Sequence, residues 1–223
     1  MWTPLDMNTP YAPSPDPFAK VRGLSGPLAV LLIIRASMRA LTYLVFEVTA
    51  PPPGQITEAQ LDQLQLIDGA LLGMENLLTL VSIILFMVWI HRVLSAIRST
   101  GQTTSISPGL AVGGWFIPLG NLVLPWLSVR SALKGLGLTS AMAGVWWLLW
   151  LANTSLSSIH QFLRQLRLVP ELMDAVPYEM IDRFYELADS TFWPYVATDT
   201  ACWAVLAAIV FMVKGAASNP PRT

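Results

Sequence analysis

The chain has few charges, a single cysteine and no excess of basic residues, and each shortage excludes a class of protein. Charged residues make up 12% of its 223 residues, whereas a soluble domain carries about a quarter. The net charge is −1, and no basic stripe with interleaved aromatics indicates a nucleic-acid partner. Cys202 alone excludes an internal disulfide and a cysteine-rich metal cluster. Because 54% of the residues are hydrophobic, the composition predicts an integral membrane protein.

The sequence also lacks the motifs of the common enzyme classes. It holds no Gly-x-Ser-x-Gly, Walker or dinucleotide-binding fingerprint. Its two histidines, His91 and His160, fall at opposite ends of predicted spans, roughly 30 Å apart, too far to share a metal ion. We therefore expect a non-enzymatic protein with no metal and no cofactor.

Four segments are apolar enough to be predicted as transmembrane helices. Spanning a hydrocarbon core of ~30 Å takes roughly 20 apolar residues in a helix. The windows are residues 27–49, 70–94, 138–160 and 192–213. The sequence thus predicts an all-α, integral membrane four-helix bundle over residues 27–213.

The distribution of Lys and Arg predicts the orientation, because cytoplasmic loops are enriched in them. One side of the predicted membrane carries eight, namely Lys20, Arg22, Arg92, Arg98, Arg130, Lys134, Lys214 and Arg222. The other side carries Arg164, Arg167 and Arg183. Both termini are therefore expected in the cytoplasm.

The remaining segments are expected to be tails and outer connections. Residues 1–26 are rich in proline and predict a disordered cytoplasmic tail, and residues 214–223 form a second tail. Residues 50–69 open with a proline bend. Apolar positions recur at helical spacing in PYEMIDRFYELAD, which predicts a separate amphipathic helix over about 171–190, lying at the outer membrane face.

The stretch GWFIPLGNLVLP, residues 114–125, is apolar yet rich in helix breakers. Pro118 and Pro125 remove backbone donors, and broken backbone is tolerated in a membrane only against protein or at the interface. We expect residues 109–126 to form a half-inserted hairpin or an interfacial segment on the cytoplasmic side. An amphipathic helix follows, so that the broken interfacial or re-entrant segment covers 109–136, between the second and third spans.

The run from WIHRV (89–93) through SPGLAVGGWFIPLGNLVLPW (107–126) resembles the bacterial membrane-protein family called domain of unknown function 4328. The shared pattern is carried by Trp115, Phe116, Pro118, Asn121, Leu122 and Pro125. The resemblance extends over about residues 70–213. It implies a multi-span protein of the bacterial inner membrane and brings no known activity.

Five ionisable residues fall inside predicted spans, where charges are rare and face a bundle interior or water. They are Arg35, Arg39, Glu47, Glu75 and Asp199. Depth estimates at 1.5 Å per residue put Arg39 near the midplane, within reach of Asp199 or Glu75. The same estimates put Arg35 nearer the cytoplasmic side, where its side chain can extend to the interface.

Polar residues at helical spacing extend this pattern to a polar core in the outer half of the bundle. Tyr43 shares a face with the two arginines, and Asn153, Ser157 and His160 share a face of the third span. Three interpretations remain open: a buried network that fixes helix packing, a small hydrophilic cavity open to the outside, or a charged contact with a partner subunit. Under the first, Asp199→Asn lowers folded yield; under the second, yield survives and binding fails.

These patterns predict an accessory or scaffold protein that binds other membrane proteins or lipids. Homo-oligomer formation is an open possibility, because Gly137, Ala141 and Gly144 form a small-residue stripe. The alternative is a small transporter or channel for an ion or polar metabolite through the polar core.

Overall fold

The fold is all-helical over the residues that the computed structural model describes, namely 16–49, 58–168 and 178–219. This confirms the predicted all-α class. Within these ranges seven helices follow one another: α1 (Ala19–Thr49), α2 (Glu58–Ser99), α3 (Pro108–Gly113), η1 (Gly114–Phe116), α4 (Gly120–Gly135), α5 (Ala141–Leu168) and α7 (Tyr178–Ser218).

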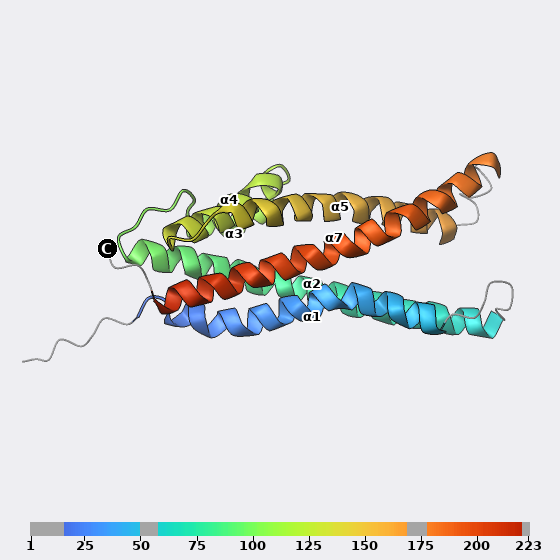
Figure 1. The fold of residues 1–223 in the computed structure, drawn as a ribbon, viewed down its shortest axis with the longest axis horizontal. Helices are drawn as coiled ribbons and strands as arrows, with labels where there is room; N and C mark the ends of the chain where they lie inside the picture. Colours follow the sequence, from blue (N-terminus) through green and yellow to red (C-terminus); the bar gives the residue numbers. More distant parts are fainter. Residues whose placement is uncertain (1–15, 50–57, 169–177, 220–223) are drawn as a thin grey trace, which may run out of the picture.

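The four long helices form an open arc in the order α2, α1, α7, α5 (Figure 1). α1 packs along α7, α2 packs on α1, and α5 packs on α7, whereas α2 and α5 are not packed closely against each other along their described residues. The short helices α3, η1 and α4 lie between α2 and α5 and contact both sides of the gap as a group. The arc is therefore closed by these short helices at one end of the bundle only.

The start of α1 and the end of α7 lie together at that same end, which we call the terminal end; the opposite end is the far end (Figure 1). Arg22 donates a hydrogen bond to the carbonyl oxygen of Ala217 at 2.9 Å. Arg22 also forms an ion pair with Asp16. The hydrogen bond from Arg22 to the Asp16 carboxylate lowers the pKa of the Asp16 carboxyl below its ordinary value. The two contacts fix the first turn of α1 beside the last turns of α7.

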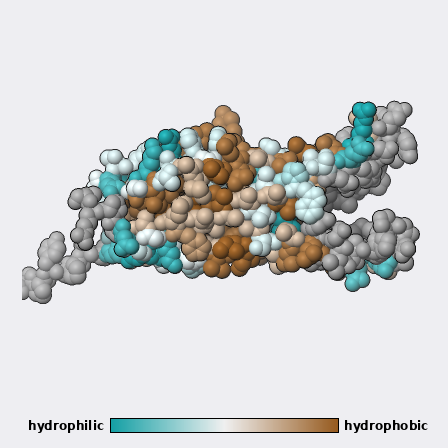
Figure 2. Space-filling view, viewed as in Figure 1, coloured by the Kyte–Doolittle hydropathy of each residue, from teal (hydrophilic) through white to brown (hydrophobic). Residues whose placement is uncertain are grey.

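Among the residues that the structure describes, three helical segments are long and apolar enough to cross a membrane: Ala19–Thr42, Gly69–Ser99 and Ser190–Ser218. α5 has 28 residues, but from its middle onward it holds Asn153, Thr154 and three serines, which lower its hydropathy. Figure 2 shows hydrophobic residues over the middle of the molecule and hydrophilic ones toward both of its ends. These features define a membrane protein with three membrane-capable helices.

The helices extend further than the hydropathy windows predicted. α1 begins at Ala19, so the prediction that residues 19–26 belong to a disordered tail is wrong; Val21 and Ser25 are fully buried. α2 begins at Glu58 rather than near residue 70. With 42 residues it is about 63 Å long, twice the thickness of a hydrocarbon core. The first turns of α2 consist of polar residues that favour a helix. Hydropathy detects only the apolar part of a helix, so it does not show where the helix begins or ends.

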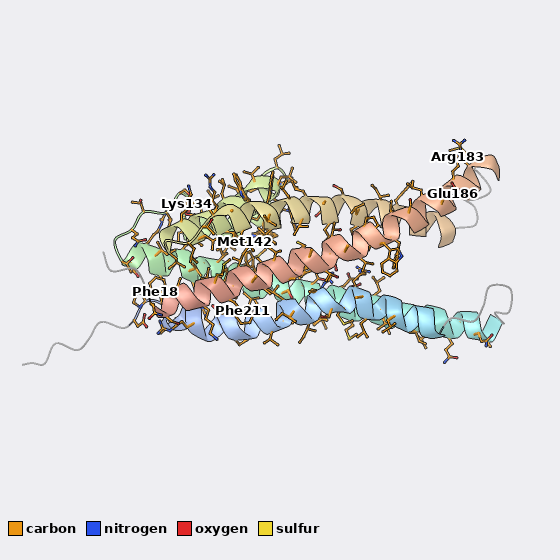
Figure 3. All side chains as sticks on the ribbon, viewed as in Figure 1. Phe18, Lys134, Met142, Arg183, Glu186 and Phe211 are labelled. Atoms are coloured by element: carbon orange, nitrogen blue, oxygen red, sulfur yellow. The ribbon has the colours of Figure 1, made fainter. Side chains whose placement is uncertain are left out.

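The predicted outer amphipathic helix is also corrected. Residues 178–190 are the first part of the continuous 41-residue α7, and the earlier positions of that prediction, 169–177, lie outside the described residues. Figure 3 places Arg183 and Glu186 at the far end of this helix, and Lys134 at the terminal end. Pro194 lies inside α7 without ending it.

The broken segment folds into a helical hairpin. Pro118 falls in the turn between η1 and α4, as its missing amide predicts. Pro125 does not interrupt a helix as expected, because it lies within the early turns of α4. At the tip the apolar side chains point outward: Phe116 is 76% exposed and Leu119 80%. Trp147 of α5 donates a hydrogen bond to the Leu122 carbonyl at 2.7 Å and so ties the hairpin to α5.

Close packing in the hairpin depends on one of two adjacent glycines. A Cβ added at Gly114 would lie 2.6 Å from Leu124 Cβ, whereas at Gly113 it would meet nothing within 4 Å. Gly114→Ala is therefore expected to lower the free energy of unfolding by about 1–3 kcal/mol through overpacking. Gly113→Ala, the matched control, should be neutral or slightly stabilising. Unfolding in detergent, followed by circular dichroism, measures both; equal stability of the two variants would contradict the packing described.

Candidate functional site in the interior of the bundle

A bidentate ion pair joins the two central helices of the arc. Arg35 of α1 places Nη1 at 2.9 Å and Nη2 at 3.3 Å from the two carboxylate oxygens of Asp199 on α7. Its Nε donates to Thr79 Oγ1 of α2 at 2.7 Å, and its guanidinium lies 5.2 Å from the ring centre of Trp203. Arg35 is 5% exposed and Asp199 1%. Two opposite charges withdrawn this far from solvent are stable only with such complete hydrogen bonding.

Asp199 is the most heavily bonded carboxylate in the described residues. Its Oδ1 accepts hydrogen bonds from Asn153 Nδ2 of α5 and from Trp203 Nε1, each at 3.2 Å, in addition to Arg35 Nη2. This one side chain therefore links α1, α5 and α7.

A second ion pair lies one helical turn further along α1. Arg39 Nη1 is 2.9 Å from Glu75 Oε2 of α2, and its guanidinium lies 4.7 Å from the ring centre of Tyr195. Glu75 Oε1 is also 3.6 Å from Arg35 Nη1. The two arginines and two acids form one connected group, the ion-pair cluster, whose formal charges cancel.

The structure corrects the predicted place of Arg35. Its side chain does not extend to an interface but pairs with Asp199. Arg39, which was predicted to reach either Asp199 or Glu75, pairs with Glu75. The cause is the earlier start of α1. Its membrane-capable part is Ala19–Thr42, so both arginines lie in the half of the helix nearer the far end.

A cavity of about 400 Å³ lies beside the ion-pair cluster, in the space where α2 and α5 do not pack together. All four long helices and η1 contribute to its wall. Asn76 of α2 and Thr154 and Ser158 of α5 line it and are exposed, so the cavity opens to the surface between these helices.

The cavity is polar toward the far end and aromatic toward the terminal end. On α2, the lining runs from Asn76 and Thr79 to Phe86. On the antiparallel α5, it runs from Ser158 back to Trp146. Both helices therefore place their polar lining residues nearer the far end.

The aromatic end is closed by the hairpin. The Trp115 ring of η1 stands edge-on to Phe86 of α2 and Trp150 of α5, with ring centres 6.1 and 6.4 Å apart. Phe86 also lies 6.0 Å from Trp146. Trp115 thus seals the gap between α2 and α5, and the cavity offers stacking surfaces at this end and hydrogen-bonding groups at the other.

The structure gathers most of the predicted polar-core residues and separates the motif residues. Arg35, Arg39, Asn153, Ser157 and Asp199 line the cavity, and Glu75 lies directly behind it. The side chains of Tyr43 and His160 lie outside the described part of the chain.

The residues of the family pattern serve the hairpin in different ways. Trp115 reaches the cavity, Phe116, Pro118 and Leu122 are exposed at the tip, and Pro125 is buried in α4. Asn121 donates its backbone amide to the Ile117 carbonyl at 2.7 Å, across the turn.

Sequence reasoning missed the aromatic wall and the serine and threonine rim. Trp146 and Trp150 precede Asn153 and Ser157 on one face of α5, at spacings of four, three and four residues. Extending the predicted polar stripe in this direction would have found them.

The fold and the site define a class: an all-helical membrane protein with an interior cavity bordered by a neutral ion-pair cluster and closed by a short helical hairpin. Within that class, a family model described as Domain of unknown function (DUF4328) matches residues 53–217. The chain belongs to this family, as the resemblance predicted. No curated protein and no solved structure matches it.

Proposed function

We propose that this protein is a non-enzymatic membrane protein that binds a lipid-like amphiphile in the cavity between α2 and α5. The observation that carries the proposal is the cavity itself: about 400 Å³, with aromatic side chains at one end and polar side chains at the other. Apolar walls with a few convergent polar groups are typical of ligand sites. Among the roles predicted from the sequence, lipid binding by an accessory protein fits this geometry best.

We further propose four spans, with α5 as the fourth, in the bacterial inner membrane and with both termini cytoplasmic. Two arguments support this arrangement. α5 runs beside α7 through the same depth (Figure 1), and the cations Arg98, Arg130, Lys134 and Lys214 all lie on segments at the terminal end. The hairpin is then re-entrant, because Trp115 reaches the level of Phe86, 13 residues inside the end of α2 at Ser99.

Filling the cavity tests the proposed function. Thr154→Trp places an indole into the cavity lining and is expected to reduce the amphiphile that co-purifies in mild detergent at least roughly tenfold, the equivalent of 1.4 kcal/mol of binding. Native mass spectrometry and lipid extraction measure the bound amount per chain.

The neighbouring position offers the control. Ser155 is exposed on the same helix and does not line the cavity, so Ser155→Trp should leave the bound amphiphile unchanged. Both variants must elute as folded protein at the wild-type position. Equal retention of amphiphile by Thr154→Trp and the wild type would show that the cavity is not the binding site.

The second candidate is a small transporter or channel, favoured by the exposure of the cavity between α2 and α5. A continuous path would have to pass the ion-pair cluster, which links α1, α2 and α7. Flux of an ion or a small polar solute into proteoliposomes, abolished by Thr154→Trp and retained by Ser155→Trp, would favour this candidate over binding alone.

A further inference from the structure

Three hydroxyl groups on the cavity wall already donate their protons to carbonyl oxygens of their own helices. Thr154 Oγ1 donates to the Trp150 carbonyl at 2.8 Å, and Ser158 Oγ donates to the Thr154 carbonyl at 2.9 Å. On the facing helix, Thr79 Oγ1 donates to the Glu75 carbonyl at 2.8 Å. A hydroxyl has one proton and two lone pairs. The exposed Thr154 and Ser158 oxygens therefore act only as acceptors, so a ligand group that contacts them has to donate hydrogen bonds.

The charges around the cavity disfavour a charged ligand of either sign. An ammonium group would meet Arg35 and Arg39, and Asp199, the carboxylate that also lines the cavity, is already bonded to Arg35, Asn153 and Trp203. A phosphate or carboxylate would have to compete with Asp199, which holds two hydrogen bonds to Arg35 at 2.9 and 3.3 Å, or with Glu75, which lies 2.9 Å from Arg39 Nη1. Breaking a buried pair in this way is strongly unfavourable. The donor is therefore an uncharged group.

From these features we infer that the cavity recognises the hydroxyl-bearing, uncharged head of an amphiphile, with its apolar part directed toward Trp115. The inference rests on the proposed function and specifies its ligand class. The head lies against Thr154 and Ser158 near the far end, and the first methylene groups lie against Phe86 and Trp150. A cavity of about 400 Å³ holds a glycerol-sized head, while longer chains leave through the opening between α2 and α5.

Three short-chain lipids that differ only at the head test this inference with the full-length protein in detergent. Dioctanoylglycerol has a free hydroxyl, its methyl ether has none, and dioctanoyl phosphatidic acid is anionic. We expect dioctanoylglycerol to bind and each of the other two to bind at least about tenfold more weakly, since one loses the donor and the other carries charge. A change in the intensity or wavelength of tryptophan emission reports binding, because four tryptophans line the cavity.

Matched variants on α5 locate the contact. Thr154→Val and Ser158→Ala each remove one acceptor and are expected to weaken dioctanoylglycerol binding about three- to tenfold, without changing the weak binding of the ether. Ser155 also bonds to its own helix, with Oγ donating to the Leu151 carbonyl at 3.0 Å, but it lies outside the cavity lining. Ser155→Ala is therefore the control and should bind as the wild type does.

The outcomes separate this inference from the proposed function. Equal binding of the alcohol and its ether, stronger binding of the phosphatidic acid, or no binding of dioctanoylglycerol would each overturn the assigned head group. If amphiphile retention still fell in Thr154→Trp, the proposed function would stand with another ligand class. If retention were unchanged as well, both would fail.

Discussion

Asp199→Ala is expected to lower the free energy of unfolding by about 3–5 kcal/mol, the usual cost of leaving a buried charge without its partner. Arg35 would keep its hydrogen bond to Thr79 but lose both contacts to Asp199. Asn153 and Trp203 would lose their acceptor at the same time. The effect is measured by denaturant- or heat-induced unfolding in detergent and by the yield of folded protein.

A paired replacement distinguishes the stranded charge from general damage to α7. The double variant Arg35→Leu with Asp199→Leu removes both charges and should recover most of the stability lost in Asp199→Ala, because an apolar pair often replaces a buried ion pair at little cost. Asp16→Asn, at the partly exposed Asp16–Arg22 pair, serves as the control and should change stability little. If Asp199→Ala unfolded like the wild type, the ion-pair cluster would have no part in holding α1 to α7.

Trp89→Ala is expected to destabilise the terminal end of the bundle by about 3 kcal/mol. Trp89 is fully buried, its Nε1 donates to Ser25 Oγ at 2.9 Å, and its ring centre lies 5.7 Å from that of Phe86. Between helices in lipid the loss comes from packing rather than from exposure to water, and the cavity left behind accounts for most of it.

Two further substitutions separate the size of the ring from its hydrogen bond. Trp89→Phe keeps most of the volume and loses the donor to Ser25, so a loss of only about 1 kcal/mol is expected. Trp193 is 58% exposed, and Trp193→Ala should have little effect. The same unfolding measurement covers all three variants. Similar losses in Trp89→Ala and Trp193→Ala would contradict the packing assigned to Trp89.

Hydropathy and charge predicted the class and much of the interior from the sequence. The apolar windows found the three membrane-capable segments and α5, and the rarity of buried charge pointed to Arg39, Glu75 and Asp199. Which arginine pairs with which acid was harder to predict from the sequence. It depends on depth along each helix, and the early start of α1 at Ala19 moved Arg35 by several residues relative to the window centre.

Periodicity left a cavity as one of three open interpretations and could not decide among them, because the cavity arises where two helices fail to pack. Helical spacing shows which face of α2 or α5 is polar, but it does not show that α1 and α7 occupy the centre of the arc and hold the other two apart. The far ends were missed for a related reason. Residues 58–69 and 178–190 are polar enough to be predicted as connections between spans, yet they form the first turns of α2 and α7.

The bond between Arg35 and Asp199 joins residues 164 positions apart, and this separation bears on how the chain is made. At about 5–20 residues per second, roughly ten to thirty seconds pass between synthesis of the arginine and synthesis of its acid. Glu75 is made much sooner and can neutralise one of the two cations meanwhile. Until α7 is synthesised, one arginine of α1 therefore has no acidic partner. During this interval α1 lies at the insertion machinery or beside α2, and the bundle is complete only when α7 has inserted.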